Sequence, residues 1–174
     1  MNGWKPVIFL EEAEIGYDLI TIDFSKKEQK SDWFLKINPN GRIPAIVDRT
    51  NSDFSVFESA AILWYLAEKY GKFLPHDKNE KSETLQWLMF QMSGIGPMMG
   101  QAMYFQRIAE PKGHRDDFAI ERYTAESRPL LEVLNTRIEQ RPATMKALTI
   151  PEAFTAFFGE GDIEKMQSVN VKKF

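Results

Sequence analysis

The sequence predicts an α/β part followed by an all-α part. Up to residue 71, apolar residues at helical spacing alternate with short runs of strand-forming residues, whereas every later pattern is helical. A chain of 174 residues suits one sizeable domain or two small ones. We therefore expect one domain at residues 1–74, a linker at 75–79, and a helical domain at 80–174.

The first 37 residues predict a helix, a strand and a second short helix. A proline near the start and Gly16 at the end favour a helix at residues 5–16. Over residues 18–24, Leu19 and Thr21 alternate with Ile20 and Ile22, as on the two faces of a strand. A short apolar pattern at residues 33–37 predicts the second helix.

Residues 38–71 predict a turn, two strands and a helix. The turn is Asn-Pro-Asn-Gly at residues 38–41, and the strands are expected at residues 45–48 and 54–57. The helix is expected to follow the second strand directly, at residues 58–71, and to end at Gly71.

Two features of this segment suit a small peptide ligand. An X-Pro bond such as Ile43–Pro44 can be held cis in a tight turn, and Ile43 can then offer its backbone to an extended ligand. Glu58 and Ser59 stand at a strand-to-helix junction, where free N–H groups receive an anion and the carboxylate can pair with an ammonium. The alternative is an ordinary hairpin and helix that binds nothing.

The second half predicts two long helices. The first covers residues 84–105 and contains three glycines and a proline within residues 93–101, which loosen a helix or admit a close neighbour. The methionines and aromatic residues around them are also typical of a core or a subunit interface. The second helix covers residues 118–140, and Pro129 inside it predicts a kink or a locally opened turn.

Composition excludes several classes of function. A net charge of −3 argues against nucleic acid or an anionic membrane as partner. The chain has no cysteine, which excludes a cysteine nucleophile and a thiolate metal site, and His76 and His114 stand in polar loops, so we expect no metal. No apolar run approaches the roughly 18 residues of a membrane span and no signal peptide is evident, so we expect a cytoplasmic protein.

Three segments carry a family resemblance: NPNGRIPAIVD, FESAAILWYLAEKYG and SGIGPMMGQ. They resemble segments of glutathione transferases. Within that family they are most similar to the class that contains the yeast nitrogen-catabolite regulator and its bacterial disulfide-reducing relatives. The resemblance covers residues 2 to 148. It implies a thioredoxin-like, glutathione-binding domain followed by an incomplete helical domain. The family's central strand before the first helix is missing, and a buried helix is missing after Gln140. We therefore expect a chain shortened at its N-terminus and internally deleted.

The resemblance also implies a set of site residues. Asn2 matches the catalytic position, where its amide would donate a hydrogen bond to a glutathione thiolate and lower the thiol pKa. Arg122 would reach glutathione across a homodimer interface. The glutathione-binding residues implied in the first domain are Gln29, Ile43, Pro44, Glu58 and Ser59. Two alternatives remain: Asn2 only caps the first helix, and Arg122 only pairs with Glu126 on the surface.

Two functions follow from these residues. The first is a glutathione-dependent transferase or disulfide-bond reductase, with glutathione as co-substrate and an electrophile or disulfide as second substrate. The second is a non-catalytic binding or regulatory protein of the same family. A third possibility is that so short a chain has no function, which a urea melt without a cooperative transition would indicate.

Overall fold

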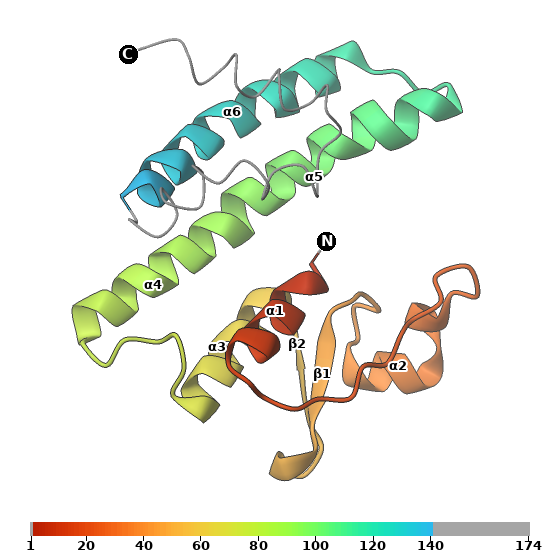
Figure 1. Cartoon of the computed structure of the whole chain (residues 1–174). Coiled ribbons are helices and arrows are strands. Elements are labelled where there is room, and N and C mark those ends of the chain that lie inside the picture. Colours follow the sequence, from red (N-terminus) through yellow and green to blue (C-terminus); the bar gives the residue numbers. More distant parts are fainter. Residues whose placement is uncertain (1, 141–174) are drawn as a thin grey trace, which may run out of the picture. The chain divides into compact units, whose positions relative to one another are not determined.

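The computed structural model describes residues 2–140, which fall into two compact units (Figure 1). The first unit ends at Ser93 and the second begins at Gly94. The linker expected at residues 75–79 lies within the first unit, and the assignment of residues 80–174 to one domain stays a prediction. The expected deletion after Gln140 concerns residues outside the described part.

The first unit contains two strands and four α-helices within its described residues. The helices are α1 (Trp4–Glu12), α2 (Asp32–Ile37), α3 (Ser59–Tyr70) and α4 (Lys78–Phe90), and the strands are β1 (Ala45–Asp48) and β2 (Phe54–Phe57). Both strands match the prediction, and they pair antiparallel with Ala45 opposite Phe57 and Asp48 opposite Phe54. Short 3₁₀ turns lie at Glu28–Lys30 and Arg49–Asn51.

The core of this unit lies between α1 and α3. Residues at helical spacing on each helix meet there and exclude water: Phe9, Leu10 and Ala13 from the α1 segment, and Ile62, Leu66 and Ala67 from α3. The cross-strand pair Ile46 and Val56 packs against this core. The hairpin and both helices are therefore held together by one apolar cluster.

The strand predicted at residues 18–24 is wrong. The chain there is irregular up to a turn at residues 24–27, it pairs with no strand among the described residues, and the described sheet contains only β1 and β2. Leu19 is 69% exposed and Ile20 is 64% exposed. A strand needs a neighbour that bonds its backbone N–H and C=O groups, and no described segment lies in that position.

The helix predicted at residues 5–16 ends earlier, at Glu12. Glu14 takes a positive φ of 58°, which turns the chain and lets Ile15 pack against the core. At the far end of α3, Gly71 takes a left-handed conformation with φ 64°, as the sequence predicts.

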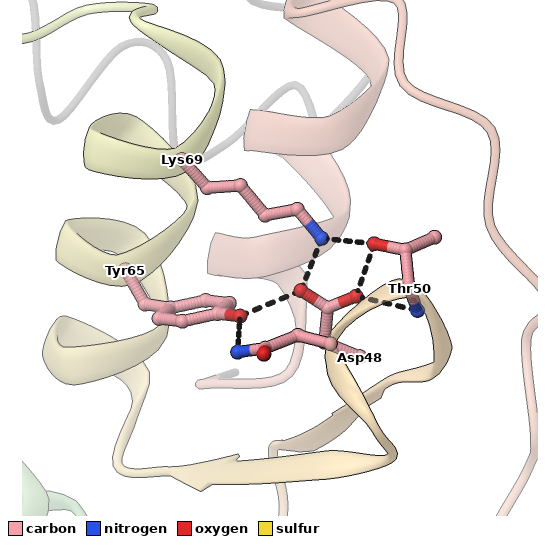
Figure 2. A network of polar contacts seen from close by, with 5 residues as sticks. Asp48, Thr50, Tyr65 and Lys69 are labelled. Atoms are coloured by element: carbon pink, nitrogen blue, oxygen red, sulfur yellow. Dashed lines mark hydrogen bonds and ion pairs between the residues drawn. The ribbon is translucent and has the colours of Figure 1, made fainter.

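A polar network ties the hairpin to α3 (Figure 2). The Asp48 carboxylate accepts hydrogen bonds from the Tyr65 hydroxyl at 2.6 Å, from the Thr50 backbone N–H at 3.0 Å and from Lys69. Asn51 also donates to the Tyr65 hydroxyl at 3.1 Å. Because these partners come from the end of β1, the following turn and α3, the network fixes how the hairpin lies on the helix.

The second unit is helical over its described residues. Its α-helices are α5 (Gly96–Tyr104) and α6 (Asp117–Glu139), which pack together, and a π-helical turn at Phe105–Ala109 and a 3₁₀ turn at Glu110–Lys112 lie between them. A Cβ on Gly94 would lie 3.2 Å from Leu130 Cδ2, so this glycine does admit a close neighbour. Another π-helical turn, Gln91–Ile95, falls where the glycines predict a loosened helix.

Pro129 lies inside α6, which continues on both sides of it, from Asp117 to Glu139. None of the helices within residues 2–140 has the length and apolar character needed to cross a membrane.

Candidate glutathione site

The Ile43–Pro44 peptide bond is cis, as the sequence predicts. The turn before it is organised by Asn38, which is only 2% exposed. Asn38 Nδ2 donates to the Arg42 carbonyl at 2.6 Å, and Asn38 Oδ1 accepts from the Asn40 N–H at 3.0 Å. Sequence reasoning assigned Asn38 to a turn but missed that its side chain sets the backbone leading into Ile43.

Gly41 brings this turn against residues 29 and 30. Its φ is +60°, and a Cβ at this position would lie 2.6 Å from the Gln29 carbonyl oxygen. Only glycine fits there, because a larger residue would be strained by its backbone conformation and would also clash. The close approach places Gln29 beside the cis-proline turn.

Gln29 and Ile43, two of the predicted glutathione residues, line one open hollow of about 390 Å³. Phe24, Lys30 and Arg42 line it as well. The Gln29 Oε1 atom is buried and has no hydrogen-bond partner among the described residues. A buried acceptor without a partner is uncommon in proteins, and a ligand N–H would satisfy it.

The first turn of α1 lies beside the cis-proline. A Cβ placed on Gly3 would lie 3.7 Å from Ile43 Cδ1. The Asn2 carbonyl accepts from the Lys5 N–H at 3.3 Å, but the helix cap is Gly3, and no side chain caps this helix end. The alternative that Asn2 serves only as the cap is therefore not supported, and the Asn2 side chain is exposed.

The N-terminus of α3 forms another corner of the site. Glu58 is exposed and takes a positive φ of 68°, and Ser59 is 3% exposed. Lys5 Nζ donates to Ser59 Oγ at 3.4 Å and to Gln91 Oε1 at 2.7 Å. Burial lowers the pKa of Lys5, and the nearby negative charge of Glu58 opposes this shift.

Lys5 and Gln91 were missed as site residues by sequence reasoning. Lys5 was seen only as the start of a helix, and its partners lie 54 and 86 residues away in the chain. Gly3, which precedes α1, thus lies near the Ile43 side chain, and Lys5 in the first turn of α1 bonds to Ser59.

Arg122 belongs to the second unit, where it is an exposed residue of α6. No ion pair joins it to Glu126 in the described part of α6, so that alternative is not observed. The role of Arg122 stays a prediction. Within residues 2–140, no cluster of three histidine, aspartate or glutamate side chains is placed to hold a metal.

The fold and the cis-proline edge define a thioredoxin-like domain with a small sheet, followed by helices. The family profile described as "Glutathione S-transferase, N-terminal domain" matches residues 1–68. The chain is 49% identical over 145 residues to the disulfide-bond oxidoreductase YfcG of Escherichia coli K12, covering 81% of this chain and 66% of that protein.

Solved structures agree with this match. A glutathione transferase from Burkholderia graminis with two glutathione molecules per subunit is 44% identical, with a TM-score of 0.76 over 80% of this chain and 59% of its own. Ure2p in complex with S-hexylglutathione is 34% identical, with a TM-score of 0.75 over 84% of this chain and 67% of its own. The chain belongs to the glutathione S-transferase family. It spans about three fifths to two thirds of these relatives.

Proposed function

We propose that this protein binds glutathione and uses the glutathione thiolate to attack a disulfide or another electrophile. The observation that carries the proposal is the cis Ile43–Pro44 bond, because the Ile43 side chain lies near Gly3, the residue that follows Asn2. The glutathione bound by the Burkholderia graminis transferase and the disulfide chemistry in the name of YfcG support the same reading.

Each site residue has one role in this proposal. The Ile43 backbone pairs with the cysteinyl residue, and Pro44 holds that edge. Glu58 and Ser59 receive the γ-glutamyl end, and Gln29 contacts the glycyl end. The Asn2 amide cannot act as a base near neutral pH, but it donates a hydrogen bond to the thiolate and thereby lowers the thiol pKa.

The chemistry belongs to the glutathione sulfur. Its thiolate attacks one sulfur of the disulfide, a new S–S bond forms, and the old one breaks. The leaving sulfur takes the electron pair and then a proton from water, which leaves a mixed disulfide with glutathione. A second glutathione thiolate resolves this mixed disulfide and releases glutathione disulfide.

The test measures the turnover of a small disulfide, 2-hydroxyethyl disulfide, in the presence of glutathione. The rate is monitored through a coupled reaction that reduces the glutathione disulfide formed. We expect turnover in the native chain and loss of it in Asn2→Ala. Asn79→Ala removes an exposed asparagine from α4 and is the matched control, with full activity expected. Equal activity in both variants would contradict the role of Asn2.

The second candidate is a non-catalytic glutathione-binding or regulatory protein. The exposure of Asn2 favours this candidate. Catalysis would require the Asn2 amide to be held in one position beside the thiolate, and an exposed side chain has few contacts that could hold it there. Glutathione binding without disulfide turnover would select this candidate. The homodimer, the cross-subunit role of Arg122 and the cytoplasmic location remain parts of the proposal that the sequence predicts.

A further inference from the structure

Lys5 holds a partly buried positive charge whose nearest partners are neutral. Its ammonium can donate three hydrogen bonds, and two go to Gln91 Oε1 and Ser59 Oγ. Among the described residues, no carboxylate lies within ion-pair distance of it, although the charge of Glu58 is close enough to act on its pKa. Charges removed from water are normally paired, so this ammonium suits an anionic ligand.

Ser59 supplies a second donor at the same place. It is 3% exposed, and among the described residues the only hydrogen-bond partners of its hydroxyl are Lys5 and the Met92 sulfur at 3.7 Å, which is a weak acceptor. As the first residue of α3, a helix of 12 residues, it also stands where backbone N–H groups lack helical partners. The Lys5 ammonium therefore lies at the N-terminal end of α3, where it and the Ser59 hydroxyl could both donate to a carboxylate.

Glu58 makes the corner suitable for an amino acid rather than for a simple anion. Its exposed carboxylate belongs to the residue before Ser59, and its negative charge is near enough to the Lys5 ammonium to act on it. An α-amino acid end carries an ammonium and a carboxylate on one carbon, and such a pair complements this arrangement.

We propose that Lys5 binds the α-carboxylate of the γ-glutamyl residue of glutathione, and that Gln91 is a positioning residue that holds the Lys5 ammonium in place. This inference rests on the proposed function. The contrasting possibility is that Lys5 has only a structural role, in which its hydrogen bond to Gln91 joins α1 to the C-terminal end of α4.

The test measures the binding of three tripeptides by calorimetry. Glutathione has both charged groups on its γ-glutamyl end, γ-aminobutyryl-Cys-Gly lacks only the α-carboxylate, and glutaryl-Cys-Gly lacks only the amino group. We expect Lys5→Met to weaken the binding of glutathione and glutaryl-Cys-Gly, the two peptides with a carboxylate at this end, about ten- to a hundredfold, as for the loss of one charge-assisted hydrogen bond. Its affinity for γ-aminobutyryl-Cys-Gly should equal that of the native chain.

A matched control is Lys36→Met, which removes an exposed lysine from α2 and should leave all three affinities unchanged. Gln91→Glu tests the positioning role, because it keeps the size of the side chain but gives Lys5 a competing carboxylate. It should weaken glutathione binding while the melting temperature of the ligand-free chain stays the same or rises.

Equal weakening of all three peptides by Lys5→Met would overturn the inference and assign Lys5 a purely structural role. Unchanged affinities in Lys5→Met would overturn it as well. Failure of the native chain to bind any of the three peptides would instead contradict the proposed function itself. A circular dichroism melt of each variant identifies any that fail to fold, in which case Lys5→Gln replaces Lys5→Met with the same expected pattern.

Discussion

Single residues shape the backbone that leads into the cis-proline edge. The buried Asn38 side chain bonds to the Arg42 carbonyl and the Asn40 N–H, and Gly41 allows the turn to lie against Gln29. Neither residue needs to touch a ligand to affect binding, because each fixes the position of Ile43 through the main chain. Their substitution should therefore lower both stability and affinity for glutathione.

Asn38→Ala should destabilise the chain by about 1–3 kcal/mol, because it removes both hydrogen bonds of a buried side chain. Urea denaturation followed by fluorescence measures this change. Asn40→Ala is the control, since the Asn40 side chain is exposed and its effect should be small. Equal destabilisation by the two variants would contradict the role of the Asn38 amide.

Gly41→Ala should be more harmful than Gly71→Ala. Both glycines have a positive φ, 60° and 64°, so both variants carry a similar backbone penalty of about 1 kcal/mol. A Cβ on Gly71 meets nothing within 4 Å, whereas one on Gly41 meets the Gln29 carbonyl at 2.6 Å. The difference between the two melting temperatures measures the clash alone, and no difference would show that the turn can move away from Gln29.

Among the elements, α3 organises the first unit. Its apolar face meets α1, its N-terminus carries Ser59, and its Tyr65 and Lys69 side chains bind the end of β1 through Asp48 (Figure 2). The hydrogen bond from Lys69 and the one from Tyr65 hold the pKa of Asp48 well below its ordinary value of 3.8. This network therefore contributes pH-dependent stability.

The sign of that dependence follows from the lowered pKa. The stabilisation by Asp48 is fully present above about pH 4, where the carboxyl is ionised in the unfolded chain, and is lost as the pH falls toward its pKa in the folded chain. We expect Asp48→Asn to be less stable than the native chain at pH 7, with the difference in unfolding free energy narrowing below pH 4. Urea titrations between pH 3 and 7 measure it.

Asp18→Asn is the control for this titration, because Asp18 forms an exposed ion pair with Arg49. Such pairs contribute little to stability, so the free energy of unfolding of this variant should equal that of the native chain at each pH. If the free energy of unfolding of Asp48→Asn also equalled that of the native chain between pH 7 and 3, the network would not stabilise the fold.

Elements with local signals could be predicted from the sequence, and those that depend on distant partners could not. The strands β1 and β2 and the cis Ile43–Pro44 bond follow from alternation, turn residues and the family motif. Residues 18–24 carry the same alternation but form no strand, because pairing needs a neighbouring strand that local sequence does not reveal. The contacts of Lys5 with Ser59 and Gln91 join three helices and left no local pattern.

At the scale of the whole molecule, ligand binding and folding are linked. A ligand that binds only the native state stabilises it by about 2.7 kcal/mol at a hundred times its dissociation constant. Glutathione should therefore raise the melting temperature of the chain in a concentration-dependent manner, measured by differential scanning fluorimetry. Glycyl-cysteinyl-glycine, which lacks the γ-glutamyl end, should give a smaller shift, and equal shifts would contradict recognition of that end.

The hairpin has one further consequence, for the handling of the protein. Within residues 2–140 the sheet has two strands, so each strand keeps one side that no described strand pairs with, and such edges pair readily with other chains. The exposed side chains of Leu19 and Ile20 add apolar surface that favours association with other molecules. Concentrated samples should therefore form oligomers and precipitates whose growth slows when either of these two side chains is replaced by lysine, as light scattering would record.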